Sequence, residues 1–157
     1  MSVLVDFLEG RGPDAAGRAI DRVLTFGPRP LERHQDFIPW LFPLAEPSLE
    51  FPDAPVLTPE DVLAVRRSPS AQYNLARART HLIWFYETTD HWLKPEDPNH
   101  LCIARIIRSL RLLAGDHAAD GVHRRIRDRI VRETAVPDAE SPSRGSLAVA
   151  GRGAPPA

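Results

Sequence analysis

His34 and Asp36 stand two residues apart at the start of an aromatic run, and a carboxylate beside an imidazole can orient the ring and set its tautomer. This pair is the sequence's candidate for acid–base catalysis or for holding a ligand. Positions i and i+2 point to different sides of a helix, so a helical setting would separate them. The structural alternative is that His34 and Trp40 donate their ring N–H groups to backbone carbonyls left unpaired by nearby prolines.

Other patterns of catalysis and metal binding are missing from the sequence. The six histidines include no pair at i, i+4 spacing, and no HExxH, Cys-x-x-Cys, Gly-x-Ser-x-Gly or glycine-rich phosphate loop is present. Cys102, the single cysteine, stands in the apolar run 101–104 and is expected to be a buried, inert thiol in a reducing compartment. We therefore expect no cofactor and no metal, and the sequence favours a noncatalytic protein.

Arginines gather towards the C-terminal part of the chain, although the formal net charge of the whole protein is only −1. Residues 104–132 hold eight arginines against three aspartates, spread over two adjacent predicted helices. Such a face could bind the phosphates of a nucleic acid or an acidic partner, with an affinity that falls steeply in salt. The alternative is that these arginines pair with acids on the domain itself. The candidate face consists of Arg105, Arg108, Arg111, Arg124 and Arg127.

Aromatic residues supply a second candidate surface. The aromatic, proline-containing stretch from Trp40 to Pro55 and the cluster Trp84–Tyr86 could line a groove for an extended peptide, with the ring faces forming its pockets. The alternative is that these rings form the core, because three tryptophans in a small domain bury most of their area.

Apolar residues recur at helical spacing along most of the chain, and no strand-like alternation is present. The fold class is therefore predicted to be all-α, with a single compact domain of about six helices. The run 31–44 is expected to be a buried helix broken near Pro39 or Pro43, and 46–55 an ordered, proline-rich loop. The predicted helices span residues 14–26, 31–44, 58–66, 68–86, 100–114 and 116–132.

Local signals define the ends of several helices. Thr58-Pro59 and Ser68-Pro69 each place a capping hydroxyl before a proline at the first helical position. Asp14 is expected to cap the first helix, which the prolines in 27–30 should end. Two apolar stripes are expected to be buried, one made of Ala71, Leu75, Ala78, Leu82 and Tyr86, the other of Ala118, Val122, Ile126 and Ile130.

From Ala135 onward the composition turns to Pro, Ser, Gly, Ala and Arg. Few large apolar groups remain to offset the entropy of ordering this segment. We therefore predict a helical domain over residues 1–134 and a disordered tail over 135–157. No apolar run is long enough to cross a membrane and the N-terminus has no signal-peptide pattern, so a cytoplasmic location is expected.

The block Leu31–Leu44, followed by Glu46-Pro47-Ser48 and by Ala54–Thr58, resembles the signature of the conserved domain of the opioid growth factor receptor family. The resemblance covers about residues 3–130. Further pieces that agree in order are Phe7–Gly10, Asp14–Arg18, Trp84–Tyr86, Asn99-His100 and Arg105–Leu113.

This resemblance implies an all-helical domain. For the animal members of the family it implies binding of an enkephalin-type opioid peptide, association with the nuclear envelope and growth inhibition. The short, arginine-rich and alanine-rich sequence without repeats resembles a bacterial member.

Three functions follow as hypotheses. The leading one is a noncatalytic binding or adaptor domain with an unidentified protein or peptide partner. The alternatives are a nucleic-acid or phosphate-ligand binder that uses the arginine face, and an enzyme built on the histidine and aspartate of the aromatic run. The candidate ligand-binding residues are His34, Asp36, Trp40, Arg105, Arg108, Arg111 and Arg124.

Overall fold

The computed structural model describes the backbone of residues 2–140 and the side chains of residues 2–134. Every regular element in this part of the chain is helical, which confirms the all-α fold class. The elements are α1 (Val3–Glu9), α2 (Ile20–Val23), α3 (Pro28–Arg33), the 3₁₀ helix η1 (Gln35–Phe37), α4 (Ile38–Leu41), α5 (Pro59–Arg67), α6 (Pro69–Thr88), α7 (Asn99–Leu113) and α8 (Asp116–Glu140).

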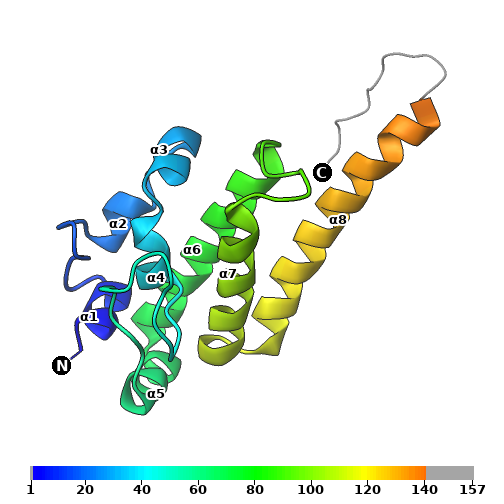
Figure 1. Ribbon diagram of the computed structural model, residues 1–157. Helices are drawn as coiled ribbons and strands as arrows, with labels where there is room; N and C mark the ends of the chain where they lie inside the picture. The colour runs from blue at the N-terminus through cyan, green and yellow to red at the C-terminus, as the bar shows by residue number, and fades with distance from the viewer. Residues whose placement is uncertain (1, 141–157) are drawn as a thin grey trace.

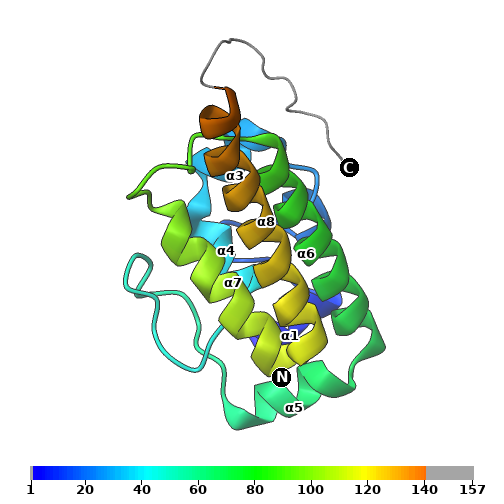
Figure 2. The same ribbon diagram turned by 90° about the vertical axis from the view of Figure 1, so that its right-hand side faces the viewer.

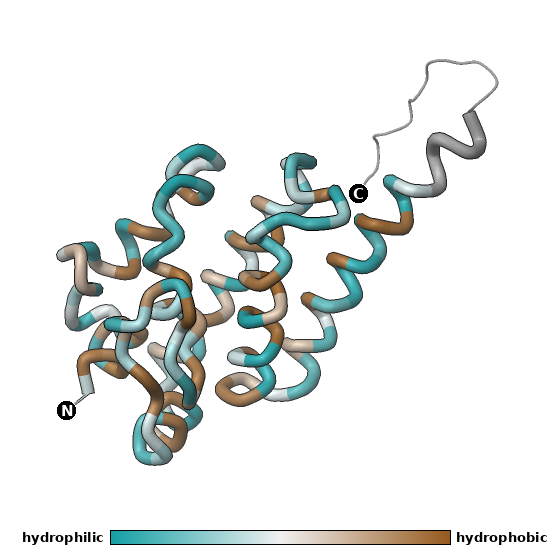
Figure 3. The backbone as a smooth tube through the Cα atoms, viewed as in Figure 1, coloured by the Kyte–Doolittle hydropathy of each residue, from teal (hydrophilic) through white to brown (hydrophobic). Residues whose placement is uncertain are grey.

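Three long helices, α6, α7 and α8, form the body of the fold. Helix α8 packs on both α6 and α7, whereas α1 packs on α6 together with α5. The short N-terminal helices therefore lie on one side of α6 and α7, and α8 lies on the other (Figure 1). Apolar and polar positions alternate along the long helices (Figure 3), as expected for helices with one buried face.

The start signals predicted for α5 and α6 are confirmed. The Thr58 hydroxyl accepts a hydrogen bond from the backbone N–H of Asp61, whose carboxylate accepts one from the N–H of Thr58, so the two form a capping box. Ser68 Oγ accepts from the N–H of Ala71 at 3.1 Å, with Pro69 in the first turn. The predicted stripe of α6 is buried along its whole length: Ala71, Leu75, Ala78, Leu82 and Tyr86.

Helix α1 was not predicted. Ser2 Oγ caps it by accepting from the N–H of Leu4, and Gly10 ends it in the left-handed region at φ 83°. The sequence signals that could have predicted this helix are the capping serine, the closely spaced apolar residues and the glycine at its end. Four of its seven residues are buried: Leu4, Val5, Phe7 and Leu8.

The predicted helix 14–26 was wrong for most of its length, because only Ile20–Val23 is helical. Asp14 does not cap a helix. Its buried carboxylate accepts from the N–H groups of Ala16 and Arg18, both at 2.9 Å, and closes a turn. Gly17 in this turn has φ 81°, a conformation that interrupts a right-handed helix.

The prolines in 27–30 begin α3, although they were expected only to end a helix. The first turn of a helix has no internal acceptors for its N–H groups, so proline is tolerated there. The run 31–44 is split into three short elements, with an unpredicted break at His34, where ψ is 80°. Pro39 lies in the first turn of α4, and the expected break near Pro43 is present.

Helix α8 continues to Glu140, six residues beyond the predicted end of the helical domain. Residues 141–157 of the predicted tail lie outside the described residues. The predicted buried face of α8 needs correction, because Ala119 is buried in place of Ala118 and Ile130 is 41% exposed. The C-terminal end of α8 projects beyond the other helices (Figure 1), so fewer neighbours cover this helix towards its end.

None of the helices in the described residues is long and apolar enough to cross a membrane.

Candidate ligand-binding groove

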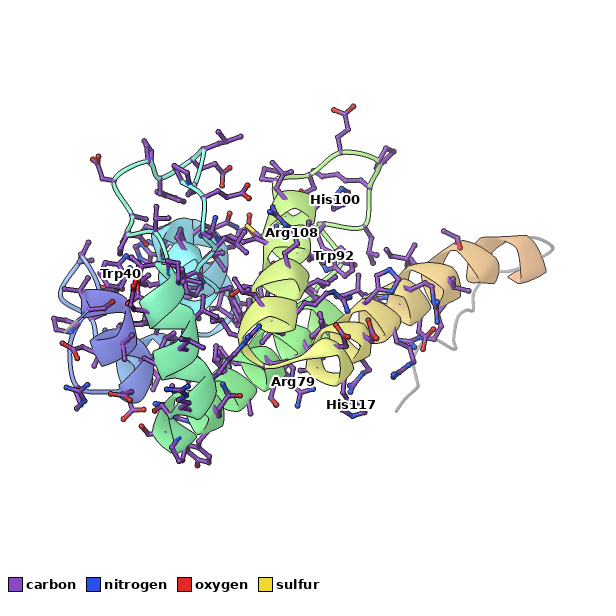
Figure 4. The ribbon with its side chains drawn as sticks, turned by 90° about the horizontal axis from the view of Figure 1, so that it is seen from below. Trp40, Arg79, Trp92, His100, Arg108 and His117 are labelled. Atoms are coloured by element: carbon purple, nitrogen blue, oxygen red, sulfur yellow. The ribbon has the colours of Figure 1, made fainter. Side chains whose placement is uncertain are left out.

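A groove of about 180 Å³ separates the proline-rich loop (residues 46–55) from helix α7. We call it the loop groove. Figure 2 shows the loop beside α7, on the side away from α6, and Figure 4 shows Arg108 on α7. The floor is made of Ile38, Pro39 and Leu44, the loop wall of residues 46–51, and the α7 wall of Leu101, Cys102, Ala104, Arg105 and Arg108.

Two large apolar side chains line the loop groove and are open to solvent. Leu49 on the loop is 96% exposed, and Leu101 on α7 is 67% exposed. Exposed apolar side chains gathered around a groove are typical of a binding surface. They could anchor the apolar side chains of a ligand.

Arg105 is the half-buried cation of the groove. Its Nε donates to the carbonyl oxygen of Phe42 at 2.9 Å, which fixes the direction of the guanidinium group. Burial, and then the neighbouring Arg108, lower the pKa of Arg105, which still leaves it cationic at neutral pH. No carboxylate in the described part of the chain forms an ion pair with Arg105. Its terminal N–H groups are therefore available to a ligand.

Arg108 is already paired. Its Nη2 donates to Oε1 of Glu46 at 2.6 Å, across the mouth of the groove. The hydrogen bond from Arg108 lowers the pKa of the Glu46 carboxyl group. Both side chains are more than half exposed, so solvent screens this pair and it can open at little cost.

The proline-rich loop is held to α7 and to itself at several points. Ser109 Oγ donates to the carbonyl of Pro43 at 2.8 Å, and the N–H of Leu57 donates to the carbonyl of Leu44 at 2.9 Å. Inside the loop, the N–H of Phe51 donates to Ser48 Oγ at 3.1 Å. The wall of the groove is therefore anchored at both ends, although it contains no helix or strand.

The buried side chain of Asn99 connects the groove to the rest of the fold. Its Oδ1 accepts from Tyr86 Oη at 3.2 Å and from Gln35 Nε2 at 3.3 Å. Its Nδ2 donates to Glu32 at 3.0 Å and to Asp97 at 2.9 Å. One amide thus joins α3, η1, α6 and α7. Sequence reasoning missed this role, since an asparagine at a helix start gives no sign of distant partners.

Cys102 is buried, as predicted, and Gln35 holds it at the inner end of the groove. Its Sγ donates to Gln35 Oε1 at 3.5 Å. Burial, followed by the nearby carboxylates of Glu50 and Glu32, raises the pKa of the Cys102 thiol to about 12. The thiol is therefore a poor nucleophile at neutral pH.

Asp36 and Trp40 lie together in a second hollow of about 310 Å³, which also borders the proline-rich loop. Asp36 accepts a hydrogen bond from Arg18 Nη2 at 2.9 Å. Trp40 is 7% exposed and packs against Phe7 with ring centroids 5.5 Å apart. Glu50 lines both hollows, so the loop stands between these two candidates and the arginines of α7.

His34 is separated from the other candidates. It is exposed, and its ring lies 6.0 Å from that of Phe26. Within the described residues it forms no hydrogen bond with Asp36, and neither His34 nor Trp40 donates a ring N–H to a backbone carbonyl. Both sequence-based interpretations of this pair therefore remain without a supporting contact.

Several arginines of residues 104–132 form ion pairs with different acidic residues of the domain. Arg111 donates to Asp116 and Asp120, both at 2.9 Å. Arg125 makes two hydrogen bonds to Glu87 at 2.8 Å. Of the other arginines in residues 104–132, Arg129 pairs with Glu133 and Arg127 with the adjacent Asp128 at 3.9 Å. Arg124 and Arg132 are exposed and have no ion pair in the described residues.

The segment that forms the floor and the loop wall has a recognisable family signature. Residues 27–91 match the opioid growth factor receptor (OGFr) conserved region. The resemblance seen in the sequence is confirmed over these residues. No curated protein and no solved structure matches the chain with significance. The OGFr match runs from α3 into the connection after α6, so Arg105 and Arg108 of the groove lie outside it.

Proposed function

We propose that this protein is a noncatalytic binding domain whose loop groove holds an extended polypeptide segment with an acidic side chain. The observation that carries the proposal is Arg105: half-buried, fixed by the Phe42 carbonyl, and without an ion-pair partner among the described residues. A guanidinium group in this state matches a carboxylate, to which it can donate two parallel hydrogen bonds.

The surroundings of Arg105 favour a polypeptide over a small anion. Leu49 and Leu101 offer apolar contacts on the two walls, and the groove is open at its mouth. An extended chain can place an apolar side chain on the leucines and a carboxylate on the arginine. The receptor role in the name of the OGFr region agrees with such a ligand, and a cytoplasmic adaptor protein would use the same contacts.

The two other functions have less support. A nucleic-acid surface needs unpaired cations, and of the five arginines in the predicted face Arg108, Arg111 and Arg127 already pair with carboxylates of the domain. An enzyme built on His34 and Asp36 needs these side chains to meet, whereas Asp36 binds Arg18.

The test is a selection of peptides from a random display library, followed by fluorescence anisotropy with a labelled selected peptide at low and high salt. Peptides bound by the protein should contain an acidic residue next to an apolar one. Arg105→Gln should weaken binding about tenfold or more, because hydrogen bonds to charged groups contribute roughly 1.5–3 kcal/mol.

Arg124→Gln is the matched control, because Arg124 is exposed and lies away from the groove. It should leave the affinity unchanged. Peptides without acidic residues, or equal affinity for wild type and Arg105→Gln, would overturn the proposal. If the protein selects no peptide, and instead captures nucleic acid that nuclease treatment removes, the arginine-face alternative is favoured.

A further inference from the structure

We propose that the outer face of α6 is an interface between two copies of this chain, related by a two-fold axis. This face is lined by six α6 residues and by Leu24 from the end of α2: Tyr73, Ala76, Arg77, Thr80, His81 and Trp84. It encloses an open hollow of about 620 Å³ and shares no lining residue with the loop groove. We call it the α6 face.

The α6 face exposes two large aromatic rings on a single helix. Tyr73 is 67% exposed and Trp84 is 41% exposed. Trp, Tyr and Arg are the residue types that contribute most of the binding energy in protein interfaces. Aromatic rings of this size left in water on one surface mark a contact site.

Each ring has a contact with another side chain of α6 before any partner binds. The guanidinium group of Arg77 lies 5.7 Å from the centroid of the Tyr73 ring. His81 stacks on Trp84 with centroids 5.4 Å apart and planes inclined by 22°, and its Nε2 is 2.9 Å from the carbonyl oxygen of Phe26. Rings that already have such contacts lose less side-chain entropy when they enter an interface.

Arg77 of the α6 face is paired with Asp21 of α2, which borders the face. Arg77 Nη1 lies 2.8 Å from Oδ1 of Asp21, and the Asp21 side chain is 78% exposed. One cation and one anion side by side attract neither a nucleic acid nor a strongly acidic or basic protein. In a second copy turned by 180°, the same pair can exchange partners, with Arg77 of each copy near Asp21 of the other.

The spacing of these residues along α6, like that of any single helical stripe, allows an antiparallel crossing about a two-fold axis. The pairs Tyr73 with Trp84, Ala76 with His81, and Arg77 with Thr80 share one midpoint, between Ala78 and Arg79. When two α6 helices cross antiparallel at this point, each aromatic ring faces the other kind of ring on the second copy. Arg77 and Thr80 lie nearest this midpoint and Ala76 one residue further out, so the two helices would cross over Arg77 and two short side chains.

Sedimentation velocity from low micromolar to about 0.5 mM protein tests the proposal. We expect a concentration-dependent dimer in the wild type. Trp84→Ala and Tyr73→Ala should each weaken it about tenfold or more, and both should fold because these side chains are exposed. Leu101→Ala, which removes an exposed side chain from the other surface, should have no effect.

Cross-linking supplies a second readout that does not depend on truncating the rings. Thr80→Cys places a thiol near the proposed axis and should give a disulfide-linked dimer under mild oxidation. Leu63→Cys, at an exposed position on α5, should not. A protein that stays monomeric up to 0.5 mM, or a dimer that both alanine variants leave intact, would overturn the proposal.

Discussion

Glu46 already presents a carboxylate at the mouth of the loop groove. Its Oε1 binds Arg108, so the chain's own acid occupies one of the two cations that a ligand would meet. An acidic ligand bound to Arg105 would place its charge near Glu46 and compete with it for Arg108. Glu46 thus limits the affinity of the empty groove for anions.

Glu46→Gln should therefore strengthen binding of the selected acidic peptide several-fold, because it removes a competing and repelling charge. Fluorescence anisotropy measures the change, and Glu96→Gln, at an exposed position in the connection between α6 and α7, is the control. Weaker binding by Glu46→Gln would mean that Glu46 contacts the ligand or shapes the loop.

His81 makes the stability of the protein depend on pH. Burial lowers the pKa of His81, and this effect outweighs that of the hydrogen bond with the Phe26 carbonyl. The unfolded chain takes up a proton as the pH falls through about 6.5, whereas the folded protein keeps this ring neutral to a lower pH. The contribution of His81 to stability is therefore complete above this value and is lost as the pH falls towards the folded pKa.

Thermal unfolding at about pH 7.5 and about pH 5.5 should accordingly show a lower Tm at the acidic pH. His81→Gln, which can still donate to the Phe26 carbonyl, should show a smaller difference between the two pH values. Carboxylates with lowered pKa, such as Glu9 and Asp97, titrate below this window. An equal pH dependence in both proteins would contradict the role given to His81.

At the scale of elements, Asn99 is the point at which α3, η1, α6 and α7 meet. Its side-chain amide accepts two hydrogen bonds and donates two, and the residue is 1% exposed. Removing the amide leaves several buried polar partners unsatisfied at once. The short elements around the groove depend on such tertiary contacts, since helices of four to seven residues are not stable alone.

Asn99→Ala should lower the free energy of unfolding by roughly 2–4 kcal/mol. Urea denaturation followed by circular dichroism gives the value, and Glu96→Ala in the preceding connection serves as the neutral comparison. A loss below about 1 kcal/mol would show that water replaces the amide contacts and that the network does not hold these elements together.

The elements that could be predicted are those with strong local signals. Thr58-Pro59 and Ser68-Pro69 fix the starts of α5 and α6 by capping bonds that need only neighbouring residues. The short helices α1 to α4 could not be placed as well, because distant packing decides them. Gly17 and the carboxylate of Asp14 turn a helix-like pattern into a loop, which apolar spacing does not reveal.

The site could be predicted only in part. The sequence shows that Arg105 and Arg108 are cations and predicts that the proline-rich loop is ordered. It does not show that they lie side by side, because about sixty residues of chain separate them. The exposure of Leu49 and Leu101 is likewise decided by which elements cover them. Charge can be read from a sequence, whereas the choice of partner for each charge depends on the fold.

For the whole molecule, the loop groove and the α6 face are separate surfaces. Figure 2 shows the proline-rich loop and α6 at opposite edges of the molecule. Two copies joined through α6 would therefore leave both loop grooves open. A dimer could hold two acidic segments at once, which increases the apparent affinity for a multivalent partner.

Trp84→Ala should consequently keep the wild-type affinity for a single labelled peptide while losing affinity for a tandem peptide with two copies of the motif. The affinity for the tandem peptide is measured with that peptide immobilised on a surface, and the affinity for the single peptide with that peptide free in solution. A loss of affinity for the single peptide would mean that the two surfaces are coupled through α6.

The most direct test of the loop groove is a titration of the ¹⁵N-labelled protein with the selected acidic peptide, followed by amide chemical shifts. We expect shifts concentrated on residues 46–51 and on Leu101–Arg108, with the α6 face unchanged. Shifts centred on the α6 face, on His34, or on the arginines of α8 would contradict it.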